Sequence, residues 1–169
     1  MQWEEDILLW VQNRVRTPFL TPIFQGISRS TDKGAVWLLL ALGMILYPRT
    51  RHAGVVCLLT ILVEVIVVNL FLKHNVARIR PFQAVEELHV LISPPNDFSF
   101  PSGHTAVAFT ASAAVFFFGY KRMAILLFAF ASLVGFSRIY LGVHYLTDVL
   151  GGAFIGILVA YGVHIATGG

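Results

Sequence analysis

The chain has 169 residues, of which 57% are hydrophobic and 12% are charged. Soluble globular domains carry about 25% charged residues, so this composition indicates an integral membrane protein and excludes a disordered chain. The net charge of +3 comes without a long cluster of Lys or Arg, which argues against nucleic-acid binding. A single cysteine, Cys57, cannot form an intrachain disulfide.

The first expected element is an amphipathic helix over residues 1–16, which we expect to lie at the membrane surface. An ordinary cytosolic helix start is the alternative. Early acidic residues and the lack of a continuous apolar core argue against a cleavable signal peptide. The apolar residues that gather on one helical face are Trp3, Ile7, Trp10 and Val11, with Leu8 and Leu9 less neatly placed.

Membrane-spanning helices are expected along most of the remaining chain. A span needs about 20 residues, and a weaker segment at 17–31 favours a short irregular span or a re-entrant piece. These elements predict an all-α fold, a polytopic membrane helix bundle of about six transmembrane helices in a single domain, 1–169. The five apolar runs lie at 34–47, 53–72, 105–119, 123–137 and 149–166.

The orientation follows from the Lys and Arg residues of the loops. With six spans and a cytoplasmic N-terminus, each side holds six of them, so the raw count decides nothing. If Lys73, Arg80 and Arg138 serve a functional site, the remaining bias places residues 49–51 and 121–122 in the cytoplasm. The site would then face the extracytoplasmic side.

The unusual polar residues form three clusters, at 73–81, 98–104 and 137–148. Because consecutive spans alternate in direction, all three clusters are expected at one face of the membrane. Ionisable residues at membrane depth are expensive to bury and are functional candidates by default. The three clusters together therefore predict one site.

The first and third clusters supply three fixed cations, Lys73, Arg80 and Arg138. Arg presents a fork of donors that suits phosphate, and Lys acts as a point charge. Lys73 and Arg80 are seven residues apart and would share a helical face if the helix continued, but Pro81 biases Arg80 away from helical geometry.

The second cluster, Pro101-Ser102-Gly103-His104, is typical of a helix start with Pro near the first turn. Free N–H groups at such a start bind anions. Gly103 allows close approach of the backbone, and the Ser102 hydroxyl can donate a further hydrogen bond.

Two histidines complete the predicted chemistry. His144 and Asp148 are four residues apart and would face each other on a helix. The carboxylate would fix the tautomer and leave the other ring nitrogen as a nucleophile. His104 comes from a different helix start and is free to act as a general acid. A metal site is the alternative for these three residues, but three nearby cations would repel a metal ion.

These motifs resemble those of the type 2 phosphatidic acid phosphatase superfamily. The pattern of that family is Lys, six residues, Arg-Pro; then Pro-Ser-Gly-His; then Ser-Arg, five residues, His, three residues, Asp. All of it is present between residues 73 and 148. It begins with Lys73 and Arg80-Pro81, continues through 101–104 and ends with Ser137-Arg138, His144 and Asp148.

The resemblance implies a role for each motif residue. His144 would be the nucleophile, Asp148 its partner, and His104 the acid that protonates the leaving oxygen. It also implies six membrane helices, an extracytoplasmic site, and neither a metal nor another cofactor. The compact size suggests a bacterial cytoplasmic membrane. The residues implied to bind the substrate phosphate are Lys73, Arg80, Ser102, Gly103 and Arg138.

We therefore expect a membrane phosphatase that hydrolyses a lipid phosphate or pyrophosphate through a phosphohistidine. Undecaprenyl pyrophosphate is slightly favoured over phosphatidylglycerol phosphate as the substrate, and motif spacing does not decide between them. A phosphotransferase that uses the same residues is the alternative, and a non-catalytic lipid-binding or transport protein is a third. The oligomeric state is open.

Glu64 is an ionisable residue in the middle of the 53–72 run. A hydrogen bond between helices and a proton relay are both open interpretations of it. The loop at 82–100 carries many apolar residues, and either covers the site or forms one wall of a lipid entrance.

Overall fold

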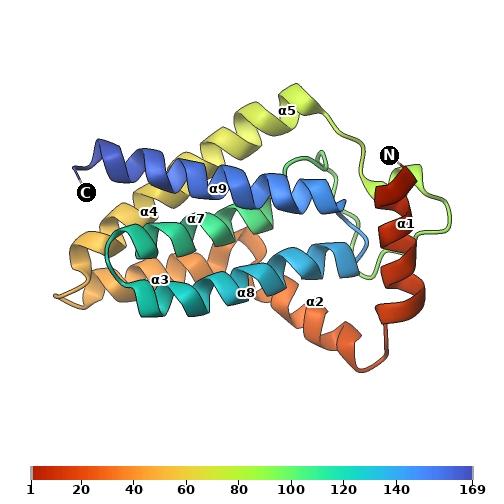
Figure 1. The fold of residues 1–169 in the computed structure, drawn as a ribbon, viewed down its shortest axis with the longest axis horizontal. Helices are drawn as coiled ribbons and strands as arrows, with labels where there is room; N and C mark the ends of the chain where they lie inside the picture. Colours follow the sequence, from red (N-terminus) through yellow and green to blue (C-terminus); the bar gives the residue numbers. More distant parts are fainter. Residues whose placement is uncertain (1, 169) are drawn as a thin grey trace.

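A computed structural model describes residues 2–168, which form helices joined by turns and loops, without a strand. Figure 1 shows a bundle of long helices with α1 lying across one of its ends. The helices are α1 (Gln2–Trp10), η1 (Val11–Val15), α2 (Leu20–Ser30), η2 (Asp32–Gly34), α3 (Ala35–Leu46), α4 (Arg51–Val65), η3 (Ile66–Leu72), α5 (Lys73–Val76), α6 (Pro81–Ala84), α7 (Gly103–Phe117), α8 (Lys121–Tyr140) and α9 (Leu146–Ala166).

The all-α membrane bundle is confirmed. Three helical segments of the described chain are long and apolar enough to cross a membrane: Arg51–Ala84, Lys121–Tyr140 and Leu146–Ala166. α7 is apolar but shorter, and α3 has 12 residues, so the count of six spans stays a prediction. The segment expected at 17–31 contains the 11-residue helix α2, about 17 Å long and well short of a 30 Å hydrocarbon core.

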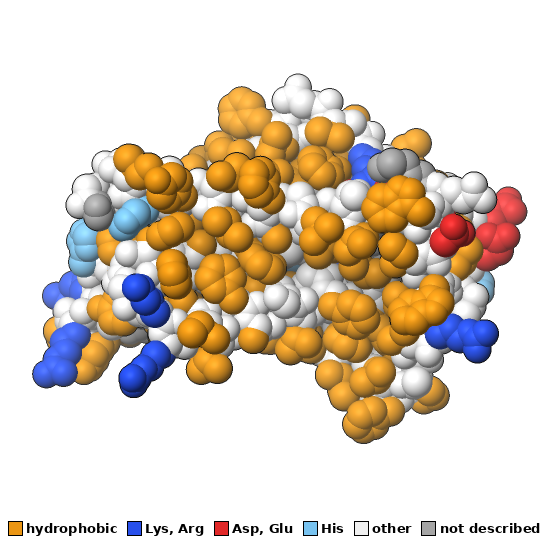
Figure 2. All heavy atoms as spheres, in the orientation of Figure 1, with side chains coloured by type: hydrophobic (Ala, Val, Ile, Leu, Met, Phe, Trp, Pro, Cys, Tyr) orange, Lys and Arg blue, Asp and Glu red, His pale blue; other side chains and the backbone are white. Residues whose placement is uncertain are grey.

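The molecular surface fits a bilayer. Figure 2 shows hydrophobic side chains covering the middle of the bundle. Leu39, Leu126 and Phe154 are among the large apolar side chains that face outward, as expected where the surroundings are lipid tails rather than water. Lys and Arg side chains gather at the end where α3 joins α4 and α7 joins α8, and acidic side chains at the opposite end, beside α1 (Figure 2).

α7 lies at the centre of the bundle and packs most closely against α9. The contact depends on small residues, because a Cβ atom at Gly156 would lie 2.4 Å from the carbonyl oxygen of Ala106. Close packing of small residues is how membrane helices associate. This close packing fixes the position of α7, and its first turn carries Gly103 and His104.

The helix that begins with α4 continues through the π-helical segment η3 into α5. It ends at Val76, where Ala77 takes a left-handed conformation with φ of 47°. Arg80 is extended, as Pro81 predicts. Lys73 and Arg80 therefore do not share a helical face, and the turn at Ala77 rather than helical spacing brings them to the same cavity.

The N-terminal helix α1 packs onto the bundle as well as facing outward. Leu8 and Val11 are buried against the protein, whereas Trp3 and Trp10 are exposed. Glu4 is fully buried, which the apolar pattern alone did not predict. The interfacial position of residues 1–16 remains a prediction, and α1 has the added role of covering the end of the bundle.

Candidate active site

Six of the motif residues to which the resemblance assigns a role line one cavity of about 800 Å³. It opens between the ends of the helices on the α1 side of the bundle and extends between α3, α4 and α7. At the opposite end of the bundle, the α3–α4 loop and the α7–α8 loop are joined by a hydrogen bond of 2.8 Å from the Tyr120 hydroxyl to the Arg49 carbonyl oxygen. The six residues are Lys73, Arg80, Gly103, His104, Arg138 and His144.

His144 and Asp148 lie close together, but not on one helix. His144 is in the loop before α9, and Asp148 is in the first turn of α9. The prediction that a helix aligns them was wrong, because the chain at Tyr145 is extended. Nδ1 of His144 is 3.5 Å from Oδ2 of Asp148, which is ion-pair range and longer than a hydrogen bond.

The contact with Arg80 determines which ring nitrogen of His144 is unprotonated. Nη1 of Arg80 is 3.2 Å from Nε2 of His144 and donates to the Val143 carbonyl oxygen at 2.8 Å. A guanidinium group only donates hydrogen bonds, so Nε2 accepts and the ring proton is on Nδ1, toward Asp148. Burial, aided by the charges of Arg80 and Arg138 against the opposing effect of Asp148, lowers the pKa of His144 to about 3. The ring is therefore neutral near pH 7, as a nucleophile must be.

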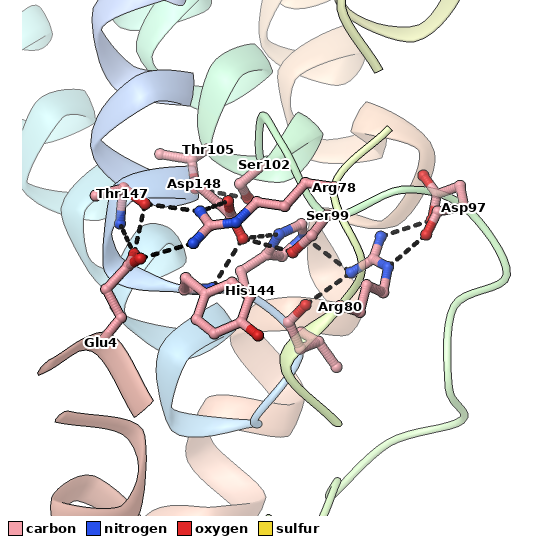
Figure 3. Close-up of polar contacts among 12 residues, drawn as sticks. Glu4, Arg78, Arg80, Asp97, Ser99, Ser102, Thr105, His144, Thr147 and Asp148 are labelled. Carbon is pink, nitrogen blue, oxygen red and sulfur yellow. Dashed lines mark hydrogen bonds and ion pairs between the residues drawn. The ribbon is translucent and has the colours of Figure 1, made fainter. Parts of the chain in front are cut away.

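Besides its contact with His144, the carboxylate of Asp148 accepts hydrogen bonds from three groups (Figure 3). Oδ2 accepts from the backbone N–H of Tyr145 at 2.8 Å and from the Ser99 hydroxyl at 2.5 Å. Oδ1 accepts from Arg78 at 2.5 Å. Asp148 does not line the cavity; it lies behind His144 and orients the ring.

Arg78 connects Asp148 to the N-terminal helix, as Figure 3 shows. Nη2 of Arg78 is 2.6 Å from Oε2 of Glu4, and Oε1 of Glu4 accepts from the hydroxyl of Thr147. The sequence analysis missed Glu4, Arg78 and Ser99. Glu4 and Arg78 are 74 residues apart, and Ser99 is 49 residues from Asp148, so no spacing pattern connects these pairs. Arg78 lies within the first polar cluster and Ser99 within the second, which is the hint the sequence offers for these two residues.

Two of the three motif cations, Lys73 and Arg80, are paired with Asp97. Nη2 of Arg80 donates to Oδ1 of Asp97 at 2.6 Å, and Lys73 donates to Oδ2. Partial burial raises the pKa of Asp97, but Lys73 and Arg80 more than offset this and lower it to about 2. The carboxylate is therefore charged and lies where a phosphate group would meet both cations.

Arg138, the third cation, has no carboxylate within ion-pair distance in the described part of the chain. Its side chain is buried and donates to the Ser28 hydroxyl. Its Nε atom has no hydrogen-bond partner among the described residues. A buried guanidinium with spare donors is prepared to receive an anion.

His104 lies in the first turn of α7, and its Nε2 is 3.0 Å from Oδ1 of Asp32. An ionised carboxylate only accepts hydrogen bonds, so Nε2 carries a proton in this arrangement. Asp32, in η2, is a partner that the sequence analysis did not identify. His104 and His144 line the same cavity and approach it from different elements.

The start of α7 matches the prediction for residues 101–104, with Ser102 extended as the N-cap. A Cβ atom built on Gly103 would be 3.9 Å from Nζ of Lys73, so this glycine leaves room beside the cation. The Ser102 hydroxyl is fully buried, accepts from Thr105 at 3.0 Å and does not line the cavity. In this structure the backbone of the turn, rather than that hydroxyl, faces the cavity.

Comparison with known proteins identifies the family. Residues 53–168 match the family model described as PAP2 superfamily. The chain belongs to the PAP2 superfamily. Phosphatidylglycerophosphatase B of Bacillus subtilis is 34% identical over 163 residues, which cover 87% of this chain and 75% of that protein.

Two further PAP2 relatives support this assignment. Undecaprenyl-diphosphatase of Sulfolobus acidocaldarius is 32% identical over 75% of this chain, which spans only 61% of the length of that protein. The crystal structure of a transmembrane PAP2 type phosphatidylglycerolphosphate phosphatase from Bacillus subtilis superposes with a TM-score of 0.77 at 29% identity, covering 99% of this chain and 85% of that one. The chain is accordingly an integral membrane protein with a PAP2 fold.

The cavity of this PAP2 chain is built around cations rather than metal ligands. Within residues 2–168, no group of three or more His, Cys, Asp or Glu side chains is arranged to hold a metal ion. Lys73, Arg80 and Arg138 line the cavity together with His144, whose Nε2 is unprotonated, and His104, whose Nε2 carries a proton. This arrangement can bind a phosphate group and transfer it.

Proposed function

We propose that the chain is a membrane phosphatase that hydrolyses a lipid phosphate or pyrophosphate through a phosphohistidine. The observation that carries the proposal is the state of His144. Its Nε2 is unprotonated, contacts Arg80 and belongs to a ring that lines a cavity with two further cations. A phosphate held by those cations would lie beside a ready nucleophile.

In the first step, Nε2 of His144 attacks the terminal phosphorus. The bond from phosphorus to the bridging oxygen breaks as the bond from phosphorus to nitrogen forms. His104, which the negative charges of the bound phosphate and Asp32 favour in its imidazolium form, gives one proton to the departing oxygen and becomes neutral, and that oxygen leaves with the lipid. Asp148 stabilises the positive charge that develops on the imidazole ring, and the three cations stabilise the charge on the phosphoryl oxygens.

In the second step, water attacks the phosphohistidine. His104, now neutral, takes a proton from that water, and Nε2 of His144 leaves as phosphate is released. The proton returns His104 to its starting state, so the cycle consumes one water. Neither step requires a metal ion, because the charge on the transferred group is balanced by Lys73, Arg80 and Arg138.

The substrate class is proposed from the cavity and the relatives. The matched relatives are named for phosphatidylglycerophosphate and undecaprenyl diphosphate, and the inner part of the cavity is lined by apolar residues that suit a lipid tail. We place the protein in the cytoplasmic membrane with the site outside. The basic loops around Arg49 and Lys121 lie at the opposite end of the bundle, as the positive-inside rule favours.

The test is phosphate release by the purified full chain in detergent with EDTA present. Undecaprenyl diphosphate, phosphatidylglycerol phosphate and phosphatidic acid are compared, with His144→Ala as the control. We expect release that depends on His144, and transfer to another lipid without release would indicate a transferase. His104→Ala should slow a substrate with a poor leaving group more than an activated ester, and loss that only an added metal restores would reject the metal-free mechanism.

A further inference from the structure

A buried acid that the mechanism does not use lies inside the same cavity. Glu64 is in the middle of the continuous helix formed by α4, η3 and α5, and it is 1% exposed. It lines the cavity together with Lys73 and His144. Neither of its carboxyl oxygens has a hydrogen-bond partner in the described part of the chain.

The described residues around Glu64 provide no hydrogen-bond partner for its carboxyl group. The cavity wall on this side is apolar. Of the polar side chains on the same helix, Thr60 donates to the Val56 carbonyl oxygen at 2.7 Å, and Asn69 lines the cavity without a hydrogen bond to Glu64. A buried carboxyl group without a partner is costly, so a polar group of a ligand is the natural partner. The apolar residues of this wall are Leu38, Leu58, Ile61, Leu62, Val65 and Val107.

The position of Glu64 along the helix sets which part of a lipid it meets. Glu64 is nine residues before Lys73, which corresponds to roughly 10–13 Å along the helix, the lower figure allowing for the π turns. With the terminal phosphate held at Lys73, Glu64 therefore meets atoms roughly that far toward the tail.

Lipid phosphates differ in what they carry at that depth. In phosphatidylglycerol phosphate the acyl ester carbonyls are about eleven bonds, or roughly 13 Å, from the terminal phosphorus in an extended chain. In phosphatidic acid they are about five bonds, or roughly 6 Å, away. A polyprenyl diphosphate has only hydrocarbon at the depth of Glu64, which would leave the carboxyl group buried and unpaired.

We propose that Glu64 is a specificity-determining residue that hydrogen-bonds an acyl ester of a phosphorylated glycerophospholipid. In its neutral form the carboxyl group donates to an ester carbonyl oxygen, which accepts. The proposal rests on the proposed function for the position of the phosphate. It selects a glycerolipid with a phosphorylated polar spacer over a polyprenyl diphosphate, reversing the slight preference drawn from the sequence.

The test compares kcat/KM for phosphatidylglycerol phosphate and undecaprenyl diphosphate in the full chain and three variants. Glu64→Leu removes the hydrogen bond, and we expect it to shift the ratio of the two substrates toward the polyprenyl diphosphate by about tenfold or more. Glu64→Gln keeps a donor and should stay within about threefold of the wild type. Thr60→Val, which removes a buried polar group of the same helix outside the cavity, should leave the ratio unchanged.

A second comparison isolates the ester. Phosphatidylglycerol phosphate with ether-linked chains lacks the carbonyl acceptors, so the wild type should prefer the ester-linked lipid and Glu64→Leu should not. An unchanged substrate ratio in Glu64→Leu, or equal use of ester and ether lipids by the wild type, would overturn the proposal. Either result would leave phosphatase activity intact and so would not count against the proposed function.

Failure of the proposed function would be recognised separately, as the absence of His144-dependent phosphate release from every lipid. In that case the role of Glu64 is tested by lipid binding instead of turnover. Ester-linked phosphatidylglycerol phosphate should raise the melting temperature of the wild type more than its ether-linked analogue, and the difference should vanish in Glu64→Leu. Equal stabilisation by both lipids in the wild type would reject the ester contact.

Discussion

The carboxylate of Asp97 accepts hydrogen bonds from Lys73 and Arg80, two of the cations that the mechanism assigns to phosphate. Removing the charge of this carboxylate should therefore strengthen phosphate binding. The change to make is Asp97→Asn, which removes the charge and nearly preserves the shape. The backbone carbonyl oxygen of Asp97, which accepts from Nε of Arg80 at 2.7 Å, remains available in this variant. Only the competition between the carboxylate and a bound phosphate for Lys73 and Arg80 changes.

The magnitude follows from the electrostatics of Asp97. Its pKa of about 2, compared with about 4 for a free aspartate, corresponds to about 2–3 kcal/mol of interaction with the two cations. Half of the side chain faces solvent, which screens the pair, so we take about half of that value, about 1 kcal/mol. The inhibition constant of inorganic phosphate should therefore fall by about five- to tenfold.

The assay is competitive inhibition of the purified protein by inorganic phosphate, with an activated phosphate ester as substrate. Glu86→Gln is the matched control, because it removes an exposed acid from the same loop and should leave the inhibition constant unchanged. An inhibition constant that rises in Asp97→Asn would refute the reasoning. It would mean that Asp97 holds Lys73 and Arg80 in position instead of competing with the substrate.

Three further predictions concern other parts of the molecule. Glu4→Gln should lower the free energy of unfolding by about 1–3 kcal/mol, because it leaves a largely buried guanidinium with one carboxylate fewer; denaturation in detergent measures this. Gly156→Ala should destabilise the bundle by about 1–3 kcal/mol through overpacking, whereas Gly162→Ala, where nothing lies within 4 Å, should have little effect, and equal effects would contradict the packing argument. Because the pKa of His144 is lowered to about 3, kcat/KM of His104→Ala for an activated ester, corrected for substrate titration, should fall less than about threefold from pH 7 to pH 5. A nucleophilic histidine of ordinary pKa would be about 97% protonated at pH 5, and kcat/KM would fall about 25-fold.

The sequence predicts much of the fold because hydrophobic runs report helices directly. The run at 149–166 corresponds to α9, and the run at 53–72 to α4 with η3. Alternating direction then places the polar clusters at one end without any knowledge of packing. The fine geometry does not follow in the same way, since His144 and Asp148 have helical spacing and yet the first of them lies in a loop.

The residues that sequence reasoning missed are those whose partners depend on loop paths. Asp97 lies 24 residues from Lys73, and Asp32 lies 72 residues from His104. Neither spacing is periodic, so no pattern connects these pairs before the loops are folded. For Glu4 a second reason adds to its distance along the chain. Its helix was interpreted from its apolar residues, whereas the acid on the inward side is what contacts Arg78.

Asp97 and Glu64 act at opposite ends of one cavity, and this separation can itself be tested. Asp97 contacts Lys73, which is roughly 10–13 Å along the helix from Glu64, and the two acids would touch different parts of a lipid. Substitutions that far apart without a shared hydrogen-bond partner are usually additive. The double variant Asp97→Asn, Glu64→Leu should therefore combine the tighter phosphate inhibition of the first change with the altered substrate ratio of the second. A substrate ratio that shifts in Asp97→Asn alone would show that the two ends of the cavity are coupled, and that phosphate and tail are not recognised independently.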